Sequence, residues 1–96
     1  MSGFADHVAE ALQSLTPGEV VTYGELAAQV GHPGAARAVG NILSNSTGLP
    51  WWRVVTSTGR LTPGHQAEQT RKLEAEGVTV RDGRVVTHPA DRGRIA

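Results

Sequence analysis

Two short amphipathic segments, separated by a break rich in glycine and proline, constrain the fold of this chain most. Thr22 and Glu25 have the spacing of a capping box, which predicts a helix that begins there and runs to about Val30. The residues Gly31-His32-Pro33-Gly34 predict a tight turn. A second helix is expected over about residues 35–44, with an inner stripe of Ala36, Val39, Ile42 and Leu43. Two short helices joined in this way predict a helix-turn-helix, with an ordinary helix–helix corner as the alternative.

The flanking segments predict further short elements. Residues 3–15 form an amphipathic pattern that favours a helix capped by Ser2, with Phe4, Val8, Ala11, Leu12 and Leu15 on its inner face. Residues 53–55 and 59–61 are expected to pair as a small hairpin. A helix is expected over residues 67–76, with Leu73 as its apolar anchor and Gly77 at its end. Residues 78–81 and 84–87 predict a second hairpin across an Asp-Gly turn.

A helix, a helix-turn-helix and then a β-hairpin follow one another in the order of a winged helix-turn-helix domain. The expected fold class is therefore mainly α with small β-hairpins. With 96 residues the chain is expected to be one domain, residues 1–96, and a monomer. Residues 88–96 are expected to form a loose tail. No apolar run suits a membrane span, and the N-terminus lacks a secretory pattern, so a cytoplasmic protein is the simplest expectation.

The charge distribution favours a nucleic-acid partner, although the net charge is zero. Residues 32–65 contain Arg37, Arg53 and Arg60 and no acidic residue. The outer face of the second predicted helix carries Arg37, Asn41, Ser44 and Asn45, which can donate to phosphates or base edges. Affinity for DNA should be modest, because few phosphates can be neutralised. A chance grouping of arginines on a solvated face is the alternative interpretation.

The two tryptophans of the chain, Trp51 and Trp52, are adjacent and directly follow Pro50. Proline fixes its own φ and favours an extended preceding residue, so both rings are presented from a constrained bend. Adjacent side chains usually point in different directions. One ring can therefore fill the core while the other faces a cavity, and at this point core packing and a functional role are both open.

Patterns typical of enzymes are missing from the sequence. There is no cysteine, so the chain offers neither a thiol nucleophile nor a disulfide. The single lysine, Lys72, lies on a charged helical segment, and the four histidines lack the spacing of a metal site. Neither a phosphate-cradling glycine loop nor a catalytic carboxylate pair is recognisable. No catalytic residue, metal or cofactor is expected.

Several separated motifs nevertheless match a known family in order and spacing. They are Gly18-Glu19-Val20-Val21-Thr22-Tyr23-Gly24-Glu25-Leu26-Ala27, Ala36-Arg37-Ala38-Val39-Gly40, Asn45, Pro50-x-x-Arg53-Val54-Val55, Gly59 and Leu73-x-x-Glu76-Gly77. Over roughly residues 4–80 the chain resembles the C-terminal DNA-binding domain of the O6-alkylguanine-DNA alkyltransferases. Those enzymes carry Pro-Cys-His-Arg-Val, whereas this chain has Trp51 at the position of the alkyl-accepting cysteine. It is thereby similar to the alkyltransferase-like proteins, although Trp52 replaces the histidine that those proteins usually keep.

The resemblance implies a role for individual residues. The second predicted helix would enter the minor groove of DNA, Arg37 would occupy the space left by a flipped base, and Asn41 and Ser44 would contact DNA. Tyr23 would press on the phosphate of the flipped nucleotide. The lesion pocket would be formed by Tyr23, Pro50, Trp51 and His65. Asn45 would brace the turn that holds the active-site segment. Arg53 and Glu76 would be structural, although Glu76 would lack its histidine partner.

The expected function is non-enzymatic recognition of O6-alkylguanine in double-stranded DNA by nucleotide flipping. As in the alkyltransferase-like proteins, the lesion would then be passed to nucleotide excision repair proteins. The alternative from another class is a winged-helix transcription regulator that reads intact sequence. A residual alkyl-transfer enzyme is disfavoured by the missing cysteine.

Overall fold

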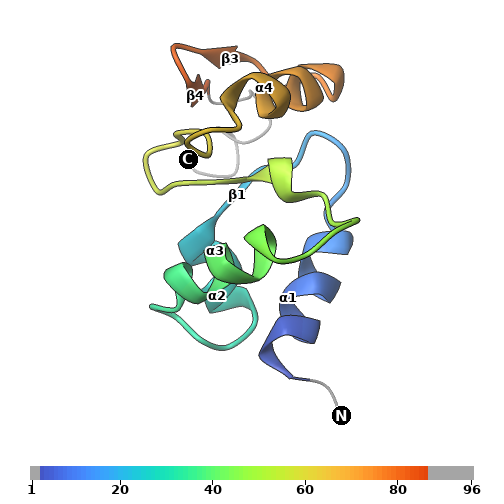
Figure 1. Cartoon of the computed structure of the whole chain (residues 1–96), viewed down its shortest axis with the longest axis vertical. Coiled ribbons are helices and arrows are strands. Elements are labelled where there is room, and N and C mark those ends of the chain that lie inside the picture. The colour runs from blue at the N-terminus through green and yellow to red at the C-terminus, as the bar shows by residue number, and fades with distance from the viewer. Residues whose placement is uncertain (1–2, 87–96) are drawn as a thin grey trace, which may run out of the picture.

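The computed structural model describes residues 3–86, in which short helices alternate with two-residue strands (Figure 1). The elements are α1 (Phe4–Gln13), β1 (Val21–Thr22), α2 (Tyr23–Gln29), α3 (Ala36–Ser44), the 3₁₀ helix η1 (Trp51–Arg53), β2 (Val54–Val55), α4 (Gln66–Ala75), β3 (Val80–Arg81) and β4 (Arg84–Val85). The expected mainly helical fold with a helix-turn-helix and a β-hairpin is confirmed. The tail predicted over residues 88–96 lies outside the described residues.

Local hydrogen bonds at the helix N-termini explain where α1 and α2 begin. The predicted capping box of α2 is confirmed, because Thr22 Oγ1 accepts from the Glu25 N–H at 3.0 Å and the Thr22 N–H donates to Glu25 Oε1 at 2.8 Å. The N-cap of α1 is Gly3 and not the predicted Ser2. The Gly3 N–H donates to Asp6 Oδ2 at 3.2 Å, which is the half of a capping box in which the third helical residue bonds back to the N-cap backbone.

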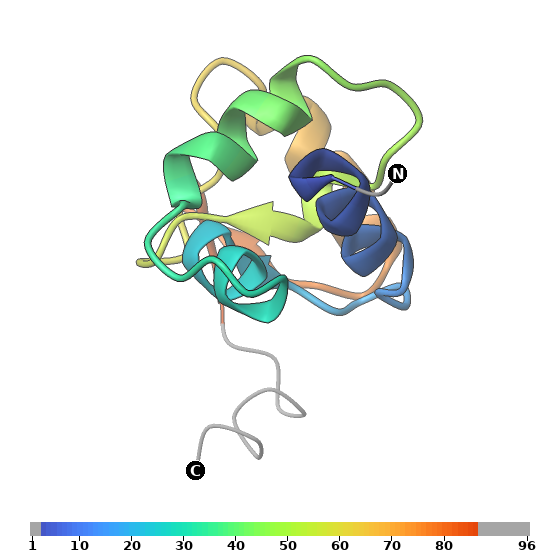
Figure 2. The ribbon, with the colours of Figure 1, turned by 90° about the horizontal axis from the view of Figure 1, so that it is seen from below.

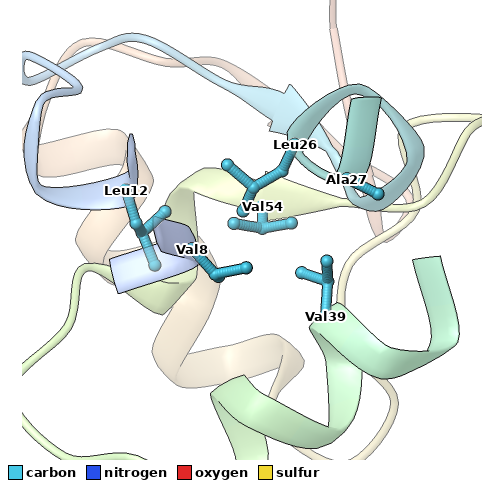
Figure 3. Packing of buried hydrophobic residues seen from close by; sticks show 6 residues of the cluster. All are labelled: Val8, Leu12, Leu26, Ala27, Val39 and Val54. Carbon is cyan, nitrogen blue, oxygen red and sulfur yellow. The ribbon is translucent and has the colours of Figure 1, made fainter. Parts of the chain in front are cut away.

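The main hydrophobic core lies among α1, α2, α3 and β2 (Figure 3). It consists of the fully buried side chains Val8, Leu12, Leu26, Ala27, Val39 and Val54. The remaining residues of the predicted inner stripes of α1 and α3 pack against this cluster at its edge, with one difference at Ala36. Ala36 is only half-buried and is not among the residues packed there, whereas the neighbouring Ala35 is.

A second, smaller core joins α4 to the C-terminal hairpin and contains Val55, Leu61, Leu73 and Val78. The strand β2 connects the two cores, since Val54 belongs to the first and Val55 to the second. Successive strand residues point to opposite faces, so two adjacent valines can serve two cores. Figure 1 shows α1, α2 and α3 in one half of the molecule and α4 with the hairpin in the other, and in Figure 2, seen from below, α1, α2 and α3 lie in front of α4.

The predicted hairpin between residues 53–55 and 59–61 is wrong. β2 pairs in parallel with β1, with Val21 opposite Val54 and Thr22 opposite Val55. A tight turn, in which the Gly59 N–H donates to Thr56 O at 2.8 Å, follows β2 and leads residues 59–61 towards β4 instead. Both valines of β2 are buried, and a strand covered on both faces is typical of parallel pairing.

The end of α4 and the last hairpin follow the local sequence. Gly77 has φ +89°, and the Val78 N–H donates to Leu73 O at 3.0 Å, as in a Schellman motif. Asp82 and Gly83 have φ values of 55° and 72°, which fits the primed turn expected for Asp-Gly. This confirms the predicted hairpin, with Val80 opposite Val85. Within residues 3–86, no helix is long and apolar enough to cross a membrane.

Candidate nucleic-acid interface

A cavity of about 430 Å³ opens between α2, α3, η1 and the start of α4. This volume falls within the roughly 300–1,000 Å³ typical of small-molecule sites. Three of the four residues predicted for a binding pocket, Tyr23, Trp51 and His65, line it, and so does Ser44 from the predicted DNA face. The other lining residues are Gly40, Leu43, Ser46, Thr62, Pro63 and Glu68.

Trp51 forms the aromatic wall of this cavity. Its ring lies edge-on to Trp52 at a centroid distance of 6.2 Å and to His65 at 5.7 Å. Edge-to-face contacts at these distances are favourable because the positive ring edge meets the negative face. The indole of Trp51 is half-buried, so it is held by its neighbours while part of it faces the cavity.

Tyr23 is the first residue of α2, directly after the N-cap Thr22, and contributes its ring and hydroxyl to the same cavity. The hydroxyl lies 3.1 Å from Thr62 Oγ1, within hydrogen-bond distance. Tyr23 is half-buried and packs against the main core. The capping box of α2 therefore also fixes the position of a pocket residue.

Arg37, Asn41 and Ser44 are all exposed and lie on one face of α3, because they are four and three residues apart. Val39, on the opposite side, is buried in the main core. The Ser44 hydroxyl donates to Asn41 O at 3.1 Å. The exposed face of α3 thus carries the guanidinium of Arg37 at one end and reaches the cavity at Ser44. The face of α3 that was expected to contact DNA is therefore continuous with the cavity.

The segment 32–65, which was expected to be cationic, exposes less positive charge than its sequence suggests. Arg53 forms an ion pair with Glu76, with Nη2 2.7 Å from Oε2, and both side chains are nearly buried. Glu68, from outside this segment, lines the cavity. Arg37 and Arg60 are therefore the arginines of the segment that face solvent without a paired carboxylate.

Glu76 joins η1, α4 and the segment after α1 through one carboxylate. Trp52 Nε1 donates to Oε2 at 2.8 Å, Arg53 Nε donates to Oε1 at 3.0 Å, and the Gly18 N–H donates to Oε1 at 2.9 Å. Arg53 Nη1 also donates to Leu15 O at 3.0 Å. Burial opposes the charged form of Glu76, but the bonds from Arg53, Gly18 and Trp52 outweigh it and lower the pKa of this carboxyl.

This network explains the second tryptophan. Trp52 packs on the second core, as expected of a structural residue, and its ring also lies 4.8 Å from Lys72 Nζ and 5.5 Å from Arg53 Cζ. Both distances suit cation–π contacts. The Trp52 indole N–H gives Glu76 a donor where the related enzymes place a histidine. The structural roles expected for Arg53 and Glu76 are consistent with these bonds.

Two expected site residues are placed differently. Pro50 precedes η1 as its N-cap and is not among the residues that line the cavity. Asn45 was expected to brace the segment around Trp51, but its Nδ2 donates to Asn41 O of its own helix at 2.8 Å. At the C-cap of α3, the carbonyls of the last turn are the nearest acceptors, and Asn45 bonds to one of them.

The sequence interpretation overlooked several residues that line the cavity. Gly40 lies four residues before Ser44 and three before Leu43, so the helical spacing of α3 could have identified them. Thr62, Pro63 and Glu68 reach the cavity only through the tertiary approach of the loop and α4, for which no local signal exists. Within residues 3–86, no cluster of His, Asp or Glu could hold a metal ion.

Comparisons with known proteins identify the family. Residues 3–78 match the family model described as 6-O-methylguanine DNA methyltransferase, DNA binding domain. The chain belongs to this family. It is 40% identical over 85 residues to a DNA base-flipping protein of Vibrio parahaemolyticus, which covers 83% of this chain and 85% of that protein. It is 38% identical over 88 residues to alkyltransferase-like protein 1 of Schizosaccharomyces pombe, which covers 83% and 81%.

The structural similarity extends over nearly the whole chain. A crystal structure of S. pombe Atl1 in complex with damaged DNA containing O6-carboxymethylguanine matches with a TM-score of 0.81 and 31% sequence identity. The match covers 95% of each chain. The expected resemblance to the alkyltransferase-like proteins, and to their fold, is thereby confirmed.

Proposed function

We propose that this protein recognises O6-alkylguanine in double-stranded DNA by flipping the damaged nucleotide into the cavity, without catalysing its repair. The observation that carries this proposal is the position of Trp51. It forms a wall of the cavity at the place where the related enzymes keep their alkyl-accepting cysteine. Base stacking on an aromatic side chain is worth roughly 1–3 kcal/mol per base, so an indole at this place favours binding of a purine.

The neighbouring residues suit a flipping mechanism. Extruding a base costs a few kcal/mol and costs least where damage has already weakened pairing. Arg37, exposed on α3, would fill the space that the base leaves and place a cation near the phosphates. Tyr23 would press on the backbone of the flipped nucleotide from the mouth of the cavity, where its hydroxyl already meets Thr62. Asn41 and Ser44 would contact DNA along the same helix.

The absence of catalysis follows from the residues that replace the reactive groups. The chain has no cysteine, so it has no thiolate to accept an alkyl group. Glu76 is held by Arg53, Trp52 and the Gly18 N–H, with no histidine among them, and its lowered pKa makes it a poor base. A bound lesion would therefore persist, and persistent binding suits a signal for other proteins.

We infer that those partners are nucleotide excision repair proteins, because a lesion that is bound but not repaired must be removed by other enzymes. One copy of the chain holds all the residues of the cavity, which supports a monomer as the binding form. We place this activity in the cytoplasm, as expected from the sequence. The alternative is a transcription regulator that reads intact sequence through α3. Such a regulator would have no use for the cavity beside that helix.

The decisive experiment compares two duplexes of identical sequence, one with guanine and one with O6-methylguanine at a single site. Dissociation constants are measured by fluorescence anisotropy, and the DNA is then digested and analysed for repaired guanine. We expect clearly tighter binding of the damaged duplex and no repaired guanine. Equal affinity for the two duplexes would support the regulator and exclude the lesion sensor. Repaired guanine would exclude the non-enzymatic mechanism.

Two variants test the assigned residues. Arg37→Ala should weaken lesion binding by about tenfold or more, equivalent to at least about 1.4 kcal/mol. Tyr23→Phe should weaken it less, because it removes only the hydroxyl and keeps the packed ring. The matched control is Arg71→Ala, because Arg71 is an exposed arginine of α4 that does not line the cavity. An Arg37→Ala protein that binds like this control would remove Arg37 from the mechanism.

A further inference from the structure

The cavity contains one acidic side chain and no lysine or arginine. Among the described residues, Glu68 is the only carboxylate in its lining, and the other polar side-chain groups are hydroxyls, the indole N–H of Trp51 and the imidazole of His65. Glu68 is exposed and makes no ion pair or hydrogen bond within residues 3–86. A negative charge therefore stands beside the site into which the damaged base would enter.

The position of Glu68 in α4 strengthens this effect. The N-terminus of α4 begins next to the cavity, since its N-cap His65 is a lining residue. A helix N-terminus carries a partial positive charge that would otherwise attract an anionic ligand. Glu68 lies in the first turn of α4 and offsets that partial charge. At this end of α4, the cavity therefore gains little attraction for an acid from the helix dipole.

The nearby cations are engaged elsewhere. Lys72, one turn after Glu68, places its ammonium 4.8 Å from the centre of the Trp52 ring. Arg53 is paired with Glu76. Arg37 lies on the exposed face of α3 and is not a lining residue. No positive side chain among the described residues is therefore placed in the cavity to compensate the charge of Glu68.

We propose that Glu68 makes the cavity selective for neutral and cationic O6 adducts of guanine over adducts that carry a carboxylate. This inference rests on the proposed function and specifies the class of lesion. Two like charges in one small cavity repel each other, whereas the phosphates of the flipped nucleotide are common to all adducts and cancel in a comparison. Carboxylate adducts are a relevant class, because the similar S. pombe Atl1 structure contains O6-carboxymethylguanine.

The test uses four duplexes that differ at one guanine. In the first duplex this guanine is undamaged and serves as the reference. In the other three it carries an O6-carboxymethyl, an O6-(2-hydroxyethyl) or an O6-(2-aminoethyl) group, which are similar in size and differ in charge. Dissociation constants are measured at pH 8, where histidine side chains are generally uncharged, and at low salt. We expect the hydroxyethyl adduct to bind about three- to fivefold more tightly than the carboxymethyl adduct, because Glu68 is exposed and interactions between exposed charges are weak. The aminoethyl adduct should bind at least as tightly as the hydroxyethyl adduct.

The variant Glu68→Gln should abolish this charge order among the three adducts. Glu74→Gln, on the same helix but outside the cavity, should keep the order. Carboxymethyl binding equal to hydroxyethyl binding in the natural protein, or a charge order that survives in Glu68→Gln, overturns the inference. If all three adducts bind no better than undamaged DNA, the proposed function itself fails, which is a distinct result.

Discussion

Glu76 connects three parts of the chain that are far apart in sequence. Its carboxylate receives hydrogen bonds from Gly18, Trp52 and Arg53, which lie 58, 24 and 23 residues away. The related enzymes place a histidine where this chain has Trp52. The indole keeps a ring N–H that can donate to the carboxylate, but it cannot act as a base. Trp52 therefore contributes a hydrogen bond to the carboxylate of Glu76.

We predict that Glu76→Gln lowers the free energy of unfolding at pH 7 by about 2 kcal/mol, because it removes the charge that pairs with nearly buried Arg53. The pKa of Glu76 is lowered from its ordinary value of 4.5 in the folded protein. Its stabilising effect is therefore complete above that ordinary value and is lost as the pH falls through the folded pKa. Urea unfolding of both proteins from pH 7 to below pH 4 measures the difference.

The exposed Glu74→Gln serves as the control and should behave like the natural protein across this range. The difference between the natural protein and Glu76→Gln should shrink once the pH falls below 4.5. A difference that stays constant down to the lowest pH would show that the charge of Glu76 does not stabilise the fold.

At the level of elements, short helices are positioned by their first residues. α2 has seven residues, too few to be stable by itself, and its capping box fixes where it begins. Thr22, the cap, also belongs to β1, which pairs with β2 directly after the two tryptophans. Tyr23 follows at once. The same two residues therefore end a strand, begin a helix and present a pocket side chain.

We predict that Thr22→Ala lowers the melting temperature by about 4–8 °C, because loss of an N-cap costs about 1 kcal/mol in a domain of this size. Thermal unfolding followed by far-UV circular dichroism measures the change. Thr22→Ser keeps a hydroxyl for the Glu25 N–H and should retain most of the stability. Equal loss in the serine and alanine variants would assign the effect to the threonine methyl group and not to the cap.

At the scale of the whole molecule, two small cores are linked by β2 and by one buried polar side chain. Gln69 of α4 is fully buried. Its Nε2 donates to Trp52 O and Val54 O at 3.1 Å each, and its Oε1 accepts from the Thr62 N–H at 2.7 Å. α4 is thereby attached to η1, to β2 and to the loop that lines the cavity.

We predict that Gln69→Met destabilises the protein by about 3 kcal/mol, although the two side chains have similar volume, because three backbone groups lose a buried partner. Lesion binding should weaken as well, since Gln69 holds Thr62, which lines the cavity, and Trp52, the neighbour of the lining residue Trp51. Chemical denaturation and anisotropy measure the two effects. Gln66→Met, an exposed residue of the same helix, is the control and should change neither.

The sequence by itself determined the local features and the family. The capping box at Thr22, the breaks at Gly31 and Gly34, the Asp82-Gly83 turn and most residues of the inner helical stripes were all predicted correctly. Each depends on residues within one or two turns of each other, so the sequence contains the whole signal. The substitution of the reactive cysteine by Trp51 was equally visible, because it is a change at one position within a specific motif.

Only the tertiary structure decided which distant groups meet. The strand partner of Val54-Val55 is β1 and not residues 59–61, because two adjacent buried valines need a core on each side. Asn45 bonds within its own helix, Glu76 gathers donors from two other segments, and Glu68 reaches the cavity from α4. These contacts are set by the packing of elements that are distant in sequence, and no local pattern encodes such a distance.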